Sequence, residues 1–309
     1  MIQFAEIPGA IEREGQTILT NSGGAGAILL MLMGTVSFAQ EQHADYVVVG
    51  KSVNTRQSAD GELTLLNTVF FAEIFGVKGG EVNNGYLHGP GDATDGLQFP
   101  AGDIQFIAGE RQFSIKALTE HFPDTTYFFS FDTPDGNVRN LPATFRRDAG
   151  EMRNPGPIGL TLQQGGEIVD PQRVNPDKDL TVIWTPFDKG APDPRGIAED
   201  MIYVMMGDCM GNETVHSGHA ISDLHALTYT AEQFVIAADN LYPGQPFQLE
   251  VEHSNMDTDV QQDIEVIVTY AATTFLDIRT LGADEQGRSC PAEPLAMDGG
   301  QTDRQRSTQ

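Results

Sequence analysis

Apolar and polar residues alternate in short runs along most of the chain, and the clearest run lies in residues 240–253. After a Pro-Gly turn, Phe247, Leu249 and Val251 alternate with polar residues. Successive side chains of a β-strand point to opposite faces, so a period of two indicates a strand with one apolar and one polar face. The run therefore predicts a half-buried strand that starts just after a turn.

The same pattern occurs earlier, in residues 122–132. Tyr127 follows Pro123 by four residues, and Phe247 follows Pro243 by the same four. The next two apolar positions of the two runs also coincide. Two copies of one strand start predict two copies of one kind of domain.

Further runs rich in β-branched and aromatic residues predict short strands throughout the chain, with Gly, Pro and Asn at the turns between them. Helical periodicity is almost absent. In the first half the predicted strands are residues 46–49, 63–77, 104–107, 112–117 and 141–146. In the second half they are residues 158–162, 180–184, 201–206, 227–230, 234–237, 264–270 and 275–279.

A segment with few apolar residues and two prolines, residues 148–157, separates the two halves and predicts a linker. The chain of 309 residues is long enough for two domains of ordinary size. We therefore expect an all-β protein with two tandem antiparallel β-sandwiches. The expected divisions are a leader (1–39), a first sandwich (40–147), the linker, a second sandwich (158–280) and a flexible tail (281–309).

The leader holds an apolar core at residues 27–33, with further apolar residues up to position 38. This core is shorter than the roughly 20 residues that span a bilayer. Small residues at Ser37 and Ala39 favour signal-peptide cleavage before Gln40. We therefore expect export to the periplasm or the extracellular space. The long, acidic start departs from a typical signal, which a misassigned start codon would explain; the alternative is a buried element of an intracellular protein.

Two stretches carry a resemblance to a known group of folds. The run D-L-T-V-I-W-T-P-F, which contains Trp184, resembles the second strand of fibronectin type III domains, whose tryptophan fills the core. The stretch around Tyr127 is similar to the tyrosine corner of that family and of immunoglobulin-like sandwiches, in which the tyrosine hydroxyl bonds back to the backbone. In the second copy Phe247 replaces the tyrosine, which implies a buried ring without that hydrogen bond. The resemblance implies a sandwich and brings no catalytic residues, because the functions of the family lie in variable loops.

The formal net charge of −26 narrows the choice of partners. A chain this acidic has no basic surface to neutralise the phosphates of a nucleic acid or of an anionic membrane. We therefore expect no nucleic-acid partner and no membrane insertion of the mature chain. We expect no cofactor; the alternative at the acidic loops is calcium, because hard carboxylate oxygens are its preferred ligands.

The candidate calcium site is the run D-T-D-V-Q-Q-D, which the pattern places in a loop between two strands. Its carboxylates are Asp257, Asp259 and Asp263. The run lacks the glycine and the terminal glutamate of an EF-hand loop. The competing interpretation is three solvated acids, and the same two interpretations apply to the pairs Asp92 with Asp95 and Asp132 with Asp135.

The two cysteines of the chain, Cys209 and Cys290, form a disulfide candidate in an exported protein. The bond would close a long loop, worth about 4 kcal/mol in the chain-entropy model. The alternative is two free thiols.

A histidine-rich segment is the other candidate for chemistry. Imidazoles bind zinc or copper, but no second closely spaced pair completes such a site. A serine near a histidine and an aspartate suggests a hydrolase triad, although a G-x-S-x-G motif is missing. Ordinary loop histidines are the competing interpretation. The residues concerned are His216, His219 and His225, with Asp208, Cys209, Ser217 and Ser222 nearby.

Together these observations predict an exported, non-enzymatic binding or structural protein of the cell envelope or the extracellular space, with a protein or glycan partner at the cell surface. One alternative is a calcium-dependent or carbohydrate-binding module. The other is a hydrolase or metalloenzyme accessory that uses the region of His216 and His219.

Overall fold

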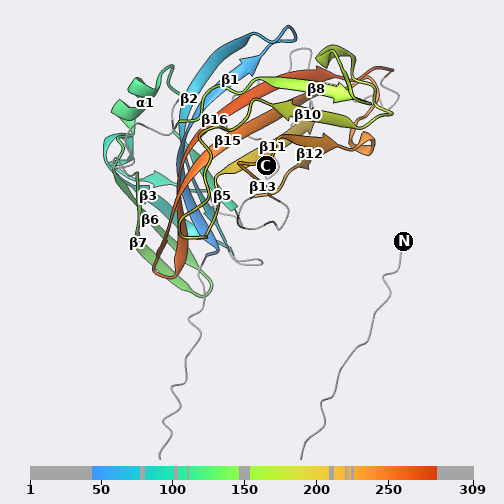
Figure 1. Cartoon of the computed structure of the whole chain (residues 1–309). Coiled ribbons are helices and arrows are strands. Elements are labelled where there is room, and N and C mark those ends of the chain that lie inside the picture. The colour runs from blue at the N-terminus through green and yellow to red at the C-terminus, as the bar shows by residue number, and fades with distance from the viewer. Residues whose placement is uncertain are drawn as a thin grey trace, which may run out of the picture. The chain divides into compact units, whose positions relative to one another are not determined.

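The computed structural model describes residues 44–76, 81–100, 104–109, 111–145, 154–208, 212–219, 221, 223 and 226–283. Its strands form one large and two small sheets, so the all-β prediction is confirmed (Figure 1). The large sheet contains β1 (Tyr46–Gln57), β2 (Leu63–Phe75), β5 (Ile104–Ala108), β11 (Met201–Asp208), β12 (Glu213–His216), β13 (Leu227–Thr228), β15 (Pro246–Gln261) and β16 (Ile264–Arg279).

The two small sheets have four strands each. The first consists of β3 (Asn83–His88), β4 (Leu97–Gln98), β6 (Thr126–Thr133) and β7 (Gly136–Thr144); the second consists of β8 (Leu160–Gln164), β9 (Glu167–Ile168), β10 (Leu180–Trp184) and β14 (Gln233–Ile236). The helices in the described residues are short: α1 (Ile115–His121) and the 3₁₀ turns η1 (Gly91–Ala93), η3 (Pro171–Arg173) and η4 (Ala238–Asn240).

The large sheet joins the two halves of the chain. Its strand order is β12-β11-β15-β16-β1-β2-β5, with β13 also paired to β11. All neighbours are antiparallel except β1 and β16, which run parallel from Tyr46 opposite Glu265 to Gln57 opposite Leu276. The two expected sandwiches therefore share one sheet, and residues 41–309 form one compact unit. The division of the chain into two sandwiches at residues 40–147 and 158–280 stays a prediction.

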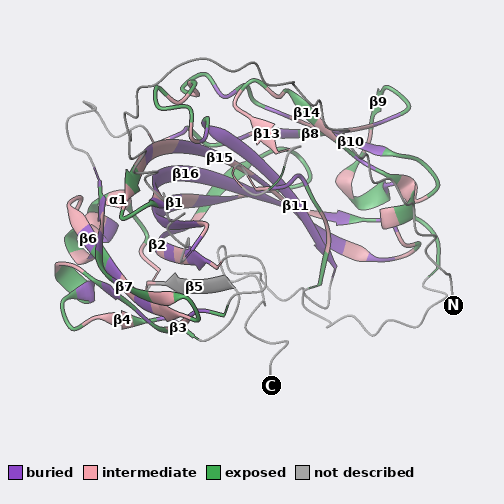
Figure 2. Cartoon of the chain, turned by 90° about the horizontal axis from the view of Figure 1, so that it is seen from below, coloured by how far each residue is buried: buried purple, intermediate pink, exposed green. Residues whose placement is uncertain are grey.

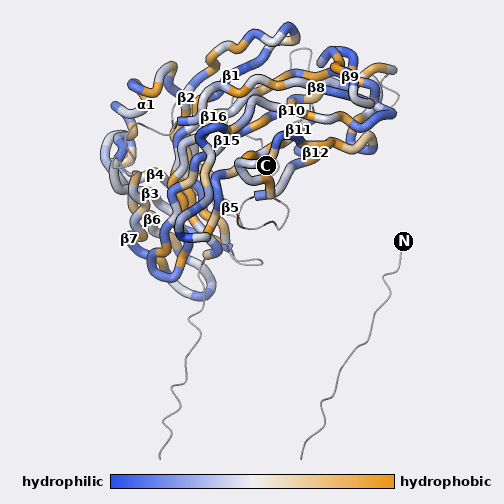
Figure 3. Tube along the Cα trace, viewed as in Figure 1, coloured by the Kyte–Doolittle hydropathy of each residue, from blue (hydrophilic) through white to orange (hydrophobic). Residues whose placement is uncertain are grey.

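Both small sheets pack on the same face of the large sheet. On β16, Val266 and Val268 belong to the core beneath the first small sheet, whereas Leu276 and Ile278 belong to the core beneath the second. These even-numbered positions share one face because side chains alternate along a strand. Figure 2 shows that the long strands of the large sheet are mostly buried, while the small sheets expose parts of their outer sides. Figure 3 shows hydrophilic and hydrophobic positions interspersed along the long strands. We call the opposite face of the large sheet, which carries Thr269 and Thr273, the pocket face.

The two aromatic strand starts lie in different sheets. Tyr127 is fully buried in the first core, and its hydroxyl donates a hydrogen bond to the carbonyl oxygen of Pro123 at 2.9 Å. Phe247 is buried in the second core without a hydroxyl. This matches what the tyrosine corner implies. However, β6 belongs to the first small sheet and β15 to the large sheet, so the repeat is local and does not extend to the position of the strand in a sheet.

The exchange Tyr127→Phe should lower the free energy of unfolding by about 1 kcal/mol, because it removes one hydrogen bond and leaves the Pro123 carbonyl without it. In thermal unfolding this corresponds to a fall of about 2–4 °C. Tyr86→Phe is the matched control, because the Tyr86 ring is 37% exposed. Equal melting temperatures for the two variants would mean that the hydroxyl contributes nothing to the corner.

The strand predicted for residues 112–117 is wrong. Gln112 makes a single isolated bridge to Thr68, and α1 starts directly afterwards. The side chain of Ser114 accepts a hydrogen bond from the Ala117 amide at 3.1 Å, which is the standard N-cap of a helix. Leu118 and Phe122, four residues apart, then bury one face of the helix in the first core. In a run this short, the Ser114 cap favours the helix more strongly than the alternation of residues favours a strand.

Several predictions concern residues that the structure does not describe. The leader 1–39, most of the tail, both cysteines and residues 148–153 of the linker lie outside the described residues. Within the described part of the chain, no helix is long and apolar enough to cross a membrane.

Candidate functional site

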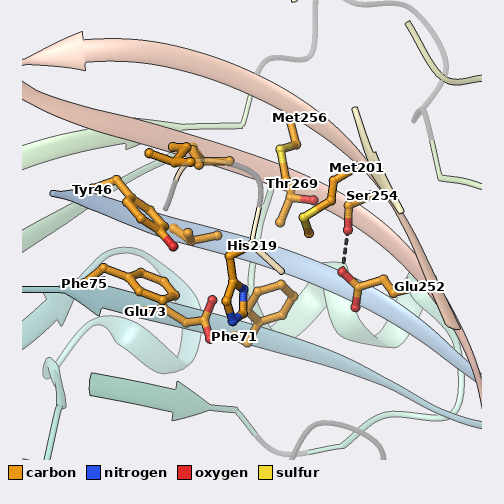
Figure 4. Close-up of a pocket in the computed structure, with 13 residues that line it drawn as sticks. Tyr46, Phe71, Glu73, Phe75, Met201, His219, Glu252, Ser254, Met256 and Thr269 are labelled. Atoms are coloured by element: carbon orange, nitrogen blue, oxygen red, sulfur yellow. Dashed lines mark hydrogen bonds between the residues drawn. The ribbon is translucent and has the colours of Figure 1, made fainter. Parts of the chain in front are cut away.

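Two adjoining cavities of about 60 and 140 Å³ lie on the pocket face, and Figure 4 shows the side chains that line the smaller one. Both are lined by the same five side chains at their junction: Phe71, Glu73, Met201, His219 and Glu252. These residues come from β2, β11, β15 and the segment after β12. The pocket therefore collects residues from distant parts of the sequence.

Strand register explains how these side chains meet. Thr273 on β16 stands directly opposite Glu252 on β15 and Asn54 on β1. Directly opposite residues on neighbouring strands point to the same face and lie within contact distance. Thr269 stands in the same way opposite Met256 and Gly50. The pocket floor is thus a set of cross-strand rows.

A continuous chain of hydrogen bonds crosses this floor. Thr273 donates to Oε2 of Glu252 at 3.0 Å and also contacts the hydroxyl of Ser52 at 3.0 Å. Ser52 donates to Oδ1 of Asn54 at 3.0 Å, and Nδ2 of Asn54 donates to Oδ1 of Asn67 at 2.8 Å. All members except Glu252 are at most 7% exposed. Buried polar groups need such partners, and a fully paired network makes the part of the structure that it crosses rigid.

Glu252 is the charged end of this chain. Burial raises the pKa of its carboxyl group, while hydrogen bonds from Ser254 and Thr273 act in the opposite direction. Glu73 and Glu250 line the same 140 Å³ cavity. Three carboxyl groups thus line one small, partly open cavity.

Aromatic rings form the walls around the carboxyl groups. Tyr46 stacks on Phe75 with ring centroids 4.1 Å apart, and His219 stacks on Tyr203 at 5.0 Å. The centroids of Phe75 and His219 are 5.9 Å apart, which links the two pairs. Figure 4 shows His219 close to Phe71 and Glu73.

A glycine makes room for the Phe71 ring. A Cβ atom at Gly50 would lie 2.4 Å from Cζ of Phe71 and 2.5 Å from Cγ2 of Thr269, closer than packed atoms allow. Without a side chain at this position, Phe71 and Thr269 approach each other across β1. The hydroxyl of Thr269 is buried at the smaller cavity and has no hydrogen-bond partner among the described residues.

The segment after β12 positions His219. The Ser217 hydroxyl accepts a hydrogen bond from the Val204 amide at 2.9 Å, which anchors the segment to β11. Gly218 has a φ of +90°, a conformation that favours glycine. The Asp223 carboxylate then accepts from the His219 amide at 2.8 Å. The chain turns here and directs the imidazole to the pocket.

The histidine region predicted from the sequence is brought together in part. His216 lies 5.9 Å from His219 between ring centroids, and its Nδ1 accepts a hydrogen bond from Gly218. The Asp208 carboxylate accepts a hydrogen bond from the backbone amide of Asn212 at 2.9 Å. This aspartate therefore ties the end of β11 to the start of the following segment. Cys209, Ser222 and His225 lie outside the described residues.

The three aspartates of the calcium prediction do not share one loop. Asp257 and Asp259 lie on β15 itself, and only Asp263 lies in the turn before β16. That turn is a tight hairpin in which Gln262 and Asp263 have positive φ values of 53° and 61°. The strands are longer than predicted because this turn needs only two residues. In the part of the chain that the structure describes, no group of three or more His, Cys, Asp or Glu side chains is placed to hold a metal ion.

The other acidic pairs have protein partners. Asp92 lies 3.0 Å from Nδ1 of His121. Asp132 accepts from Nδ2 of Asn84 at 2.8 Å and forms an ion pair with Arg139. These contacts account for two of the four acids without a metal.

Sequence reasoning named His219 but missed Glu252 and Thr269. The alternation in residues 247–252 placed Glu250 and Glu252 on the polar face of the strand. The sequence pattern that points to Glu252 is the pair of glutamates at alternate positions of one strand. This pattern alone does not show that the polar face of the strand lines a pocket. The chain matches no protein-family model, and no curated protein matches it in sequence.

Proposed function

We propose that this protein is a non-enzymatic binding protein that takes a small ligand, or one side chain of a larger partner, into the pocket on the large sheet. The observation that carries the proposal is the 140 Å³ cavity beside a buried hydrogen-bonded polar chain. Binding sites are concave and combine an apolar wall with a few fixed polar groups. Phe71 and Met201 supply the wall here, and Thr273 and Asn54 supply fixed polar groups.

The size of the pocket limits the ligand. A cavity of about 150 Å³ in a protein core holds one benzene molecule. The larger cavity of about 140 Å³ therefore accepts a group of about six non-hydrogen atoms. A polysaccharide would place only part of one sugar unit in it, and a peptide only the end of one side chain.

The local geometry supports binding rather than hydrolysis. The Ser217 hydroxyl is engaged with the backbone of β11, where it holds the His219 segment in place. The two oxygens of Glu252 accept hydrogen bonds from Ser254 and Thr273. These arrangements fix the shape of the pocket. Export and a protein or glycan partner at the cell surface remain part of the proposal, on the grounds of the leader pattern and the acidic composition.

We expect members of a panel of small solutes to bind, as detected by saturation-transfer NMR with monosaccharides, carboxylates, alcohols and amines at millimolar concentration. The exchange Val69→Phe should abolish the signal, because Val69 lines the larger cavity and a ring would fill it. Val235→Phe is the matched control, because Val235 is 48% exposed on the second small sheet.

Circular dichroism melting verifies that both variants fold. If Val69→Phe does not fold, Met201→Phe fills the same cavity from β11. The proposal is refuted if no solute of the panel gives a signal, or if the signal persists unchanged in the folded variant with the filled cavity.

A further inference from the structure

The pocket has a one-sided charge. Glu73 and Glu252 line both cavities, and Glu250 lines the larger one. Among the described lining residues there is no lysine or arginine, and His219 is the one basic side chain. Arg56, which lies on β1 together with four lining residues, forms an ion pair with Asp277 instead. The pocket is therefore electrostatically suited to a positive group.

The walls of the pocket favour the same sign of charge. The face of an aromatic ring carries partial negative charge and attracts ammonium and guanidinium groups, most strongly where water is excluded. Phe71 lines both cavities, Tyr203 the larger one, and Tyr46 and Phe75 the smaller one. The rings and the carboxyl groups thus surround the same volume.

A buried hydroxyl supplies an independent sign of a ligand. Thr269 is 3% exposed, and its Oγ1 has no hydrogen-bond partner in the described part of the chain. Leaving a buried polar atom unpaired is unfavourable, so such atoms in native structures usually meet water or a ligand. Thr269 lines the smaller cavity together with Glu252. An N–H donor placed there would meet a neutral acceptor and a carboxylate at the same site.

We propose that the pocket binds the alkylammonium or guanidinium group of a small organic cation. This inference rests on the proposed function. The charged group occupies the junction of the two cavities, where Glu73, Glu252 and Phe71 line both (Figure 4). The alkyl part extends along Met201. A free amine and a lysine or arginine side chain of a partner carry the same group, and the experiment separates these two sources.

Protonation of Glu252 adds a pH dependence. Burial raises the pKa of this carboxyl group, so part of the population is neutral at a pH where an exposed glutamate is charged. A cation binds the charged carboxylate more tightly than the neutral carboxyl group. Binding of a cation therefore releases the proton of a neutral Glu252. Affinity for a cation should therefore rise as the pH increases, up to the pH at which the amine itself loses its proton, near 10.

The test compares three probes of equal length by isothermal titration calorimetry: n-butylammonium, 1-butanol and butyrate. We expect n-butylammonium to bind at least ten times more tightly than 1-butanol, and butyrate to give no heat of binding. Methylguanidinium serves as the second cation. A tripeptide with a central lysine and capped ends identifies the source, because tighter binding of the peptide points to a partner side chain and weaker binding to a free amine.

Glu252→Gln should reduce the affinity for n-butylammonium at least tenfold and leave that for 1-butanol unchanged. The variant should melt no lower than the native protein, because the neutral amide places no charge in the buried site. Glu232→Gln is the matched control, since Glu232 is exposed and lies outside the pocket.

Three outcomes overturn the inference in different ways. If sugars or alcohols bind in the open pocket but neither cation binds or competes, the ligand class is wrong and the proposed function stands. If no probe binds to the native protein, both fail. Equal loss of cation binding in Glu252→Gln and Glu232→Gln would assign the attraction to the overall negative charge.

Discussion

The exchange Asp124→Ala is expected to lower the free energy of unfolding by about 3 kcal/mol, because it removes a counter-charge from a buried ammonium group. Lys51 is completely buried on β1, and its Nζ forms an ion pair with Asp124, which is 11% exposed. The same Nζ lies 5.1 Å from the centroid of the Phe145 ring. Breaking a buried pair is far more harmful than replacing it, since the remaining charge stays out of water. The pair joins the large sheet to the loop between α1 and β6.

Urea unfolding followed by circular dichroism measures this loss, with an unchanged dependence on urea concentration. Asp135→Ala is the matched control, because Asp135 is exposed in the turn between β6 and β7 and should change stability by less than about 0.5 kcal/mol. The double exchange of Lys51→Met with Asp124→Leu should recover most of the loss, because it removes both charges. A stability of Asp124→Ala equal to that of the control would show that the ion pair does not stabilise the fold.

A second large effect is expected from acid at His253. This side chain is 3% exposed and stacks on Phe187 with ring centroids 4.6 Å apart. Burial lowers its pKa from 6.5 to about 4. Between these values the unfolded chain binds a proton that the folded protein excludes. Stability is therefore fully present above pH 6.5 and is lost as the pH falls towards 4, by about 3 kcal/mol in total and about 2 kcal/mol at pH 5.

Urea unfolding at pH 7.5 and pH 5 measures this dependence. His253→Phe should remove most of the acid loss, because a second ring can stack on Phe187 and cannot take a proton. His88→Gln should keep the loss, since His88 is exposed on β3. If the native protein and His253→Phe lose the same stability between the two pH values, the acid sensitivity belongs to other groups.

Local patterns predicted most strands, but not their partners. The apolar run at residues 46–49 and the pattern at residues 264–270 were each recognised as strands, and they form parts of β1 and β16. Nothing in either run indicates that the two pair in parallel, because a partner more than 200 residues away leaves no local signal. The two-residue turn at Gln262 and Asp263 was predicted as a longer loop, because the end of β15 is polar and neither turn residue is glycine.

Local sequence patterns likewise predicted only part of the candidate site. Alternation on β15 separates Glu250 and Glu252 from the apolar set, and this separation is confirmed in the structure. Alternation does not show which face of a sheet another layer covers. The small sheets cover the face of Leu249 and Val251, so the polar face of the strand became the floor of a pocket rather than a solvated surface. Only the sheet order and register decide this.

The parallel pairing of β1 with β16 also has a consequence for the synthesis of the protein on the ribosome. The chain emerges from its N-terminus, so β1 is made long before the strand that flanks it. Contacts between such distant segments have a high contact order and form late, because a long loop must close first. Until residue 279 has left the ribosome, one edge of β1 has no partner strand, and an open strand edge invites association between chains. The newly made protein therefore depends on reaching its last strand quickly or on a chaperone that covers the edge.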